Sequence, residues 1–130
     1  MSIARTALLL ASVAGFSGVA LGAFGAHGLK ARMGSKPDGE QRMAWWGTGA
    51  QYHLVHAVAI GLAAVRPDPM HEGSALAPWL FLLGIALFSG SLYVMALTGI
   101  RKLGAVTPLG GLSFLAGWAA LAVHALKIVD

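Results

Sequence analysis

His53 and His56 stand three positions apart in the stretch "GAQYHLVHA", and Gln51 and Tyr52 come directly before them. Residues three or four positions apart share one face of a helix, so the two imidazoles would lie side by side and Tyr52 one turn before His56. The stretch lies inside a run from Met43 to Val65 that contains no Asp, Glu, Lys or Arg. A polar group in such a setting is a candidate for function, because leaving it unpaired there is costly.

Further polar residues occupy three other runs of the same kind. The complete candidate cluster is His27, Gln51, Tyr52, His53, His56, Tyr93 and His124. At 1.5 Å per residue, His53 lies about 15 Å from one end of its helix, near the middle of a membrane. We expect Tyr93 at a similar depth, and His27 and His124 near opposite ends of the bundle.

Three kinds of chemistry suit these residues. In the first, they form hydrogen bonds across helices and fix the register of a bundle, which we favour. In the second, neutral histidines relay protons or line a small polar path, although the runs contain no Asp or Glu, on which proton-coupled transporters commonly rely. In the third, His53 and His56 bind a metal or haem, but a third ligand at that depth is lacking. We therefore expect no cofactor and no metal.

The composition favours a membrane protein. Apolar residues make up 57% of the 130 residues and charged residues 11%, against roughly 45–50% and 25% in soluble proteins. The net charge of +4 comes from few basic residues without interleaved aromatics, which argues against nucleic-acid binding. The chain has no cysteine, so it offers no thiol chemistry. We see no set of nucleophile, base and orienting residue, so we expect no enzyme.

The charged residues separate four apolar runs that are each long enough to cross a membrane. We predict an all-α, up-down bundle of four transmembrane helices in one domain, residues 1–130, with helices at about 6–29, 43–65, 77–100 and 105–127. Pro67 and Pro69 would stop the second helix, and Pro78 suits the first turn of the third. Thr107 and Pro108 would start the fourth helix; the alternative is a start near Leu103 with a kink at Pro108.

Two further patterns concern the helix ends. The N-terminal stretch, with Arg5, the apolar "TALLLASVAG" and small residues up to Ala23, imitates a secretory signal peptide. We expect it to remain as the first helix, because the apolar run continues to Leu29, where Gly28 and Lys30 would mark the helix end. Trp45, Trp46 and Trp79 lie near predicted helix ends, as in an aromatic belt.

Small residues are expected to pack the helices, since close backbone approach drives helix association in lipid. Glycines recur every three or four positions in the first helix, a spacing typical of a left-handed helix pair. The predicted packing residues are Gly15, Gly18, Gly22, Gly25, Gly90, Ser91, Gly110 and Gly117. We expect the first and fourth helices to be among the closest contacts, and Gly22→Leu to disrupt the bundle more than a change at Leu10.

The distribution of Lys and Arg predicts the orientation, because short cytoplasmic loops are rich in them. Six basic residues lie in the two loops on one side, Lys30, Arg32, Lys36, Arg42, Arg101 and Lys102, and three lie on the other, Arg5, Arg66 and Lys127. This pattern places both termini outside the cytoplasm.

Four stretches, "ALGAFGAHGLK", "WWGTGAQYHLVHAVAI", "LFSGSLYVMALTG" and "LGAVTPLGGLSFLAGW", resemble the YgdD/YwdK family of small bacterial membrane proteins, which includes the eukaryotic transmembrane protein 256. The resemblance covers nearly the whole chain. It implies a four-helix protein of the bacterial plasma (inner) membrane, or its organellar counterpart, and no settled activity. Its signature positions map to Gly22, Gly25, His27, Gly28, Gln51, Tyr52, His53, His56, Gly90, Ser91, Tyr93, Thr107, Pro108, Gly110 and Gly117. The loop "KARMGSKPDGEQRMA" looks longer and more basic than its counterpart in the family.

We therefore expect a structural or accessory membrane component that contacts lipids and self-associates or docks beside a larger membrane complex. The alternative is a transporter or channel-like protein for protons, small solutes or a lipophilic ligand, with the intramembrane His, Tyr and Gln side chains along its path.

Overall fold

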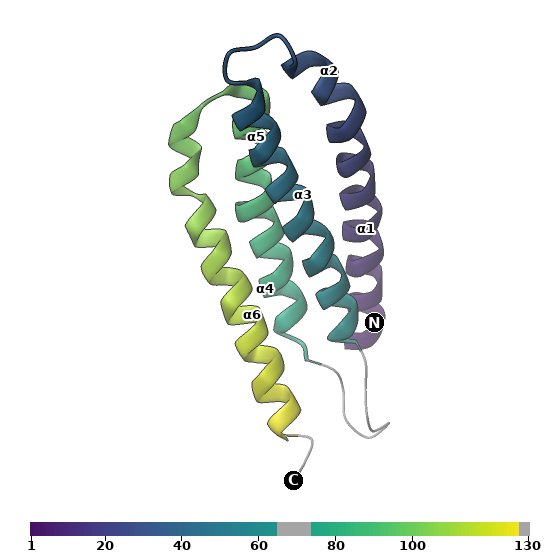
Figure 1. The fold of residues 1–130 in the computed structure, drawn as a ribbon. Helices are drawn as coiled ribbons and strands as arrows, with labels where there is room; N and C mark the ends of the chain where they lie inside the picture. The colour runs from purple at the N-terminus through teal and green to yellow at the C-terminus, as the bar shows by residue number, and fades with distance from the viewer. Residues whose placement is uncertain (65–73, 128–130) are drawn as a thin grey trace.

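The computed structural model describes residues 1–64 and 74–127, and these residues form four helical rods that run alternately up and down (Figure 1). The first rod joins α1 (Ile3–Phe24), η1 (Gly25–Leu29) and α2 (Lys30–Met33). The second is α3 (Gly39–Leu62). The third joins α4 (Ala77–Gly84), η2 (Ile85–Ser89) and α5 (Gly90–Thr98), and the fourth joins η3 (Arg101–Ala105) and α6 (Thr107–Lys127). The start of α1 and the end of α6 lie at the same end of the molecule (Figure 1).

The helix ends have local causes. The Ser2 hydroxyl oxygen accepts a hydrogen bond from the Arg5 N–H at 3.2 Å and so caps α1. Pro78 lies in the first turn of α4, where its missing N–H leaves no hydrogen bond unmade. Gly99 ends α5 with φ of 74°, a left-handed conformation that glycine adopts without steric cost. α6 begins at Thr107, as in the first of the two alternatives for the fourth helix.

The first two rods extend beyond the expected bounds. The first continues to Met33, so Gly28 and Lys30 do not end it. The reason is η1, a π-helical segment in which the Lys30 N–H donates to the Gly25 carbonyl and keeps the backbone bonded through this stretch. The second rod begins at Gly39, four residues before Met43. The expected end of that helix at Val65, and Arg66, Pro67 and Pro69, lie outside the described residues.

Within the described residues, three rods are long and apolar enough to cross a membrane, judged by length and composition alone. They are Ile3–Met33, Ala77–Thr98 and Arg101–Lys127. α3 has 24 residues, which is sufficient length. It carries Gln51, His53 and His56, which lower its hydropathy relative to the other three. The three apolar rods are therefore established as candidate spans, and α3 is the polar member of the bundle.

The rods pack as two pairs joined through α3. α1 lies along α3, and α6 lies along α4 and η2, while α3 also contacts α4, η2 and α5. The expectation that the first and fourth helices are among the closest contacts is wrong, because α3 and the third rod lie between α1 and α6 (Figure 1). One apolar cluster surrounds Ile60, Phe81 and Phe114, and a second surrounds Leu29 and Trp46.

The glycines of α1 and η1 divide into two kinds. A Cβ at Gly18 would approach the Leu54 side chain to 2.8 Å, and one at Gly25 would collide with the Trp46 ring, so both glycines permit contact with α3. Gly15 and Gly22 have no atom within 4 Å of that position. Leu10, in contrast, packs against the first apolar cluster. Packing within the chain thus argues against the expected order of Gly22 and Leu10, which remains a prediction for melting experiments.

In the second pair of rods, glycines meet phenylalanines. A Cβ at Gly110 would meet the Phe88 backbone, and one at Gly117 would lie 2.6 Å from the Phe81 ring. Gly90 meets nothing closer than 3.9 Å. The Ser91 hydroxyl lies 2.6 Å from that of Thr107 and joins α5 to the start of α6.

Candidate functional site

His53 is buried on α3 and connects three rods. Its Nδ1 lies 3.0 Å from the Tyr93 hydroxyl on α5, and its Nε2 lies 3.3 Å from the Ser17 hydroxyl on α1. The Ser17 hydroxyl also lies 2.9 Å from the Val13 carbonyl oxygen. The predicted pair of His53 and Tyr93 is thus in direct contact, with Ser17 as a third member that the sequence did not indicate.

One arrangement of hydrogens satisfies all four hydrogen-bonded groups, those of Val13, Ser17, His53 and Tyr93. The Ser17 hydroxyl donates to the Val13 carbonyl, which can only accept. The Ser17 oxygen then accepts the Nε2–H of His53, and the Tyr93 hydroxyl donates to Nδ1. His53 is neutral in this arrangement, with its hydrogen on Nε2 and its lone pair occupied by Tyr93.

The surroundings of His53 are shaped by glycine and tryptophan. Gly49 leaves room for the Tyr93 ring, because a Cβ there would lie 3.1 Å from Tyr93 Cε1. The Trp46 ring lies 4.5 Å from the Tyr93 ring, and its Nε1 donates to the Leu21 carbonyl at 2.8 Å. Trp46 is only 3% exposed, so its expected place in an aromatic belt is wrong. It is an internal connection between α3 and α1.

His56 has a second, separate set of partners. Its Nδ1 lies 2.8 Å from the Tyr52 carbonyl oxygen, and the Trp118 Nε1 lies 3.2 Å from its Nε2. A carbonyl only accepts and an indole N–H only donates, so Nδ1 carries the hydrogen and Nε2 accepts. His56 is therefore a neutral imidazole in the opposite tautomer to His53.

Aromatic rings surround His56. The Phe114 ring stacks on the imidazole with centroids 3.5 Å apart and planes 9° apart, and the Phe81 ring centroid lies at 5.6 Å. His56 is 5% exposed. The tie between α3 and α6 is thus an imidazole that contacts the rings of Phe81 and Phe114 and the Trp118 indole. The sequence analysis did not single out Trp118. The feature that could have indicated it is its position well inside the fourth apolar run, since the other tryptophans lie near predicted helix ends.

Of the remaining predicted residues, Tyr52 belongs to the second site, and the other three lie apart from both. His27 is exposed on η1, and His124 is half-buried near the end of α6. Gln51 is exposed on α3, and Tyr52 is 42% exposed, with its ring stacked on those of His56 and Phe114. The cluster of seven therefore consists of two buried histidine sites and three residues that lie apart from them.

These sites offer little for ligand chemistry. Both imidazole lone pairs accept hydrogen bonds inside the bundle, so neither histidine has a free nitrogen for a metal. In the described part of the chain, no three His, Asp or Glu residues come close enough together to hold a metal ion. Every buried side-chain nitrogen or oxygen of those residues has a hydrogen-bond partner. The chemistry of this arrangement is cross-linking of helices.

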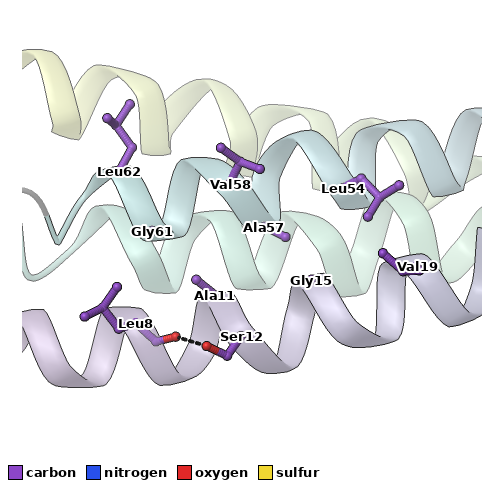
Figure 2. A pocket seen from close by; sticks show the side chains of 10 residues that line it. All are labelled: Leu8, Ala11, Ser12, Gly15, Val19, Leu54, Ala57, Val58, Gly61 and Leu62. Carbon is purple, nitrogen blue, oxygen red and sulfur yellow. Dashed lines mark hydrogen bonds between the residues drawn. The ribbon is translucent and has the colours of Figure 1, made fainter.

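An apolar groove of about 720 Å³ runs between α1 and α3. Figure 2 shows its lining residues on α1 and α3, two helices that lie side by side. Its floor contains Ala11, Gly15, Ala57 and Gly61. Ser12 is the polar side chain among the lining residues, and its hydroxyl donates to the Leu8 carbonyl of its own helix at 2.8 Å. The groove thus presents a smooth hydrocarbon surface and no group suited to catalysis.

Comparison with known proteins places the chain in one family. A family described as "Protein of unknown function (DUF423)" matches residues 21–111. The UPF0382 membrane protein YwdK of Bacillus subtilis is 43% identical over 122 residues, which cover 92% of this chain and 95% of the relative. The UPF0382 inner membrane protein YgdD of Escherichia coli K12 is 44% identical over 125 residues, covering 95% of this chain and 92% of the relative.

A third relative extends the same pattern. The UPF0382 membrane protein SH2409 of Staphylococcus haemolyticus is 38% identical over 122 residues, covering 94% of this chain and 96% of the relative. No solved structure matches. The relatives are named as membrane proteins, and the three apolar rods agree with those names. The resemblance to the YgdD/YwdK family is confirmed, and the chain belongs to the DUF423 family of membrane proteins.

Proposed function

We propose that this chain is a non-enzymatic structural or accessory protein of the bacterial plasma membrane, in which all four rods cross the bilayer. One observation carries the proposal: both ring nitrogens of His53 and of His56 are bonded within the bundle. A histidine on a path for protons or solutes needs a face open to water, whereas these two are 4% and 5% exposed. Their bonds instead fix α3 against α1, α5 and α6.

The assignment of α3 as a fourth span rests on length, position and pairing. Its 24 residues extend about 36 Å, enough for a hydrocarbon core of about 30 Å. It lies between the other rods and contacts both the first and the third. His53 and His56 lower the hydropathy of α3. Because both are hydrogen-bonded inside the bundle, they expose no unpaired polar group to lipid.

The orientation follows from charge. Lys30, Arg32, Lys36 and Arg42 lie around the connection from α2 to α3, and Arg101 and Lys102 lie in η3 at the same end (Figure 1). The Arg101 guanidinium lies over the Trp45 ring at 5.9 Å, which joins these two basic connections. Under the positive-inside rule this end is cytoplasmic, and both termini are on the other side.

Most of the described residues lie within the rods, which favours work within the membrane plane. Exposed aliphatic side chains such as Val13, Val58 and Leu115 cover its sides. We infer contacts with lipids and either self-association or docking beside a larger membrane complex. No catalytic step is assigned to any residue.

A flux measurement tests this proposal against transport. The full chain is reconstituted in liposomes, and proton flux under an imposed pH gradient is compared with that of protein-free liposomes and of the His53→Ala/His56→Ala variant. We expect background flux from all three, because neither histidine faces a water-filled path. Flux from the wild type that exceeds background and is lost in the double variant would contradict the proposal. Circular dichroism of both proteins confirms that helices are present.

A further inference from the structure

We propose that α3 binds α3 of a second copy of this chain, through an outward stripe centred on Gln51. This inference rests on the proposed insertion of all four rods. The stripe consists of residues on α3 that are exposed in the single chain: Ala44, Thr48, Gln51, Val55, Val58 and Leu62. Val58 and Leu62, which Figure 2 labels on α3, also line the groove between α1 and α3.

The depth of Gln51 is the first reason. It is twelve residues from Gly39 and eleven from Leu62, which are the ends of α3. At 1.5 Å per residue it lies about 16–18 Å from either end, close to the middle of the membrane. Its amide makes no side-chain hydrogen bond to another described residue, whereas every buried polar side-chain atom of those residues is paired. An amide exposed to lipid at this depth is costly, so a polar partner there would be strongly favoured.

The spacing of the stripe is the second reason. Its residues follow one another at intervals of four, three, four, three and four. Alternating intervals of four and three are the spacing of the two apolar positions in a heptad, which keeps one seam facing a partner helix in a left-handed pair. An amide within such a seam can specify the register and the number of helices, and Gln51 is the only amide of the stripe. Gln51 occupies that position between Thr48 and Val55.

The third reason selects a second copy over another partner. Two copies inserted in the same orientation are related by an axis perpendicular to the membrane, which places identical residues at identical depth. Gln51 then faces Gln51. An amide carries both donors and an acceptor, so it is complementary to itself and can form two hydrogen bonds across the axis. The same symmetry sets Val55 and Val58 against their copies.

A small-molecule ligand fits this face less well. The hollow beside Gln51 measures about 260 Å³ and is lined by Gln51, Tyr52, Val55 and His56. Ligand pockets usually have volumes of about 300–1,000 Å³ and enclose most of the ligand. The His56 nitrogens at its edge are already bonded to Tyr52 and Trp118. A ligand in this hollow would contact only Gln51 and Val55 of the stripe, whereas a second helix would contact its whole length.

The absence of cysteine in the sequence makes the test direct. Val58→Cys places a thiol in the stripe, and Val123→Cys places one on α6. Both valines are exposed, at 74% and 52%, and each is four residues before its helix end. The full chain is reconstituted in liposomes, oxidised, and examined for disulfide-linked dimers. Because a disulfide needs Cβ atoms about 3.5–4.5 Å apart, only residues near the axis form one efficiently. We expect dimers from Val58→Cys and few from Val123→Cys.

Gln51 is then changed in the Val58→Cys background. Gln51→Leu should reduce cross-linking about three- to tenfold, the effect of losing interhelical hydrogen bonds in a membrane. Gln51→Asn keeps an amide and should retain more of it. Equal cross-linking of Val58→Cys and Val123→Cys, or no effect of Gln51→Leu, would overturn the inference. Proton flux is a separate readout, so a failure here leaves the proposed function to be decided by that measurement.

Discussion

The two pairs of rods use glycine differently. Along α6 and the third rod, Gly84 receives the Phe114 ring, Gly110 receives Phe88, and Gly117 receives the Phe81 ring. Along α1 and η1, only Gly18 and Gly25 receive a side chain of α3, and Gly15 and Gly22 face open space within the chain. The difference shows that glycine spacing does not by itself define an interface. A bulky side chain at the matching height on the facing helix is also needed.

Exchanging glycine for alanine in each pair gives the largest expected contrast. A Cβ at Gly110 would lie 2.6 Å from Phe88 Cβ and 2.7 Å from its Cα, so the helices must separate. We expect Gly110→Ala to lower the free energy of unfolding by about 1–3 kcal/mol. Gly22→Ala has room and gains helix propensity, so it should raise stability by up to about 1 kcal/mol. Thermal unfolding in one detergent measures both.

The sign of the difference is decisive, because both variants add one methyl group to a helix. If Gly22→Ala lowered the melting temperature as much as Gly110→Ala does, the distinction between the two pairs would be wrong. If an added methyl group had the same effect at any helix position, the melting temperatures of both variants would shift in the same direction.

The connection between the two pairs gives a smaller effect. His56→Phe keeps an aromatic ring among Phe81 and Phe114 but leaves the Trp118 N–H without its acceptor. We expect a loss of about 1 kcal/mol, the low end of the cost of an unsatisfied donor, because Trp118 is 41% exposed.

Adding Trp118→Phe to His56→Phe removes the orphaned donor. The double variant should then be more stable than the sum of the two single changes predicts, as a double-mutant cycle would measure. Strict additivity of the two changes in unfolding free energy would show that the Trp118–His56 bond does not join α3 to α6.

The smallest effect concerns the connection between α2 and α3. The hydrogen bond from Arg42 Nε to Asp38 Oδ2, at 2.9 Å, holds the pKa of the Asp38 carboxyl below its ordinary value of 3.8. Since the folded pKa is the lower one, the pair contributes its full stabilisation above pH 3.8 and loses it as the pH falls through the folded pKa. The Asp38 side chain is 36% exposed, so the contribution of the pair is small. NMR titration should show the Asp38 pKa rising towards the ordinary value in Arg42→Gln. An unchanged Asp38 pKa in that variant would exclude Arg42 as the cause.

Much of the fold could be predicted because charge marks the ends of apolar runs. The four helical rods, and the start of α6 at Thr107 and Pro108, follow from charge and proline chemistry. The continuation through Gly28 to Met33 could not be predicted, because it depends on π-helical hydrogen bonding in η1. The choice of helix neighbours was also beyond the sequence, since it depends on which side chain meets each glycine.

The sequence predicted which residues form the candidate site better than it predicted their hydrogen-bond partners. The depth of His53 and Tyr93 placed them together, and they are hydrogen-bonded. His56 shares a helix face with His53 only approximately, and its partner Trp118 is 62 positions away in the sequence. Sequence spacing describes neighbours on one helix, whereas these bonds are made between helices.

Nitrogen NMR of the two imidazoles in a lipid bilayer tests most directly whether the buried histidines are fixed internal ties. The ¹⁵N signals of His53 and His56 are assigned with the variants His53→Ala and His56→Ala. We predict two neutral rings in opposite tautomers, with the hydrogen on Nε2 in His53 and on Nδ1 in His56. Rapid exchange between tautomers in either ring, or the same tautomer in both, would contradict the hydrogen-bond arrangement from which the structural role is inferred.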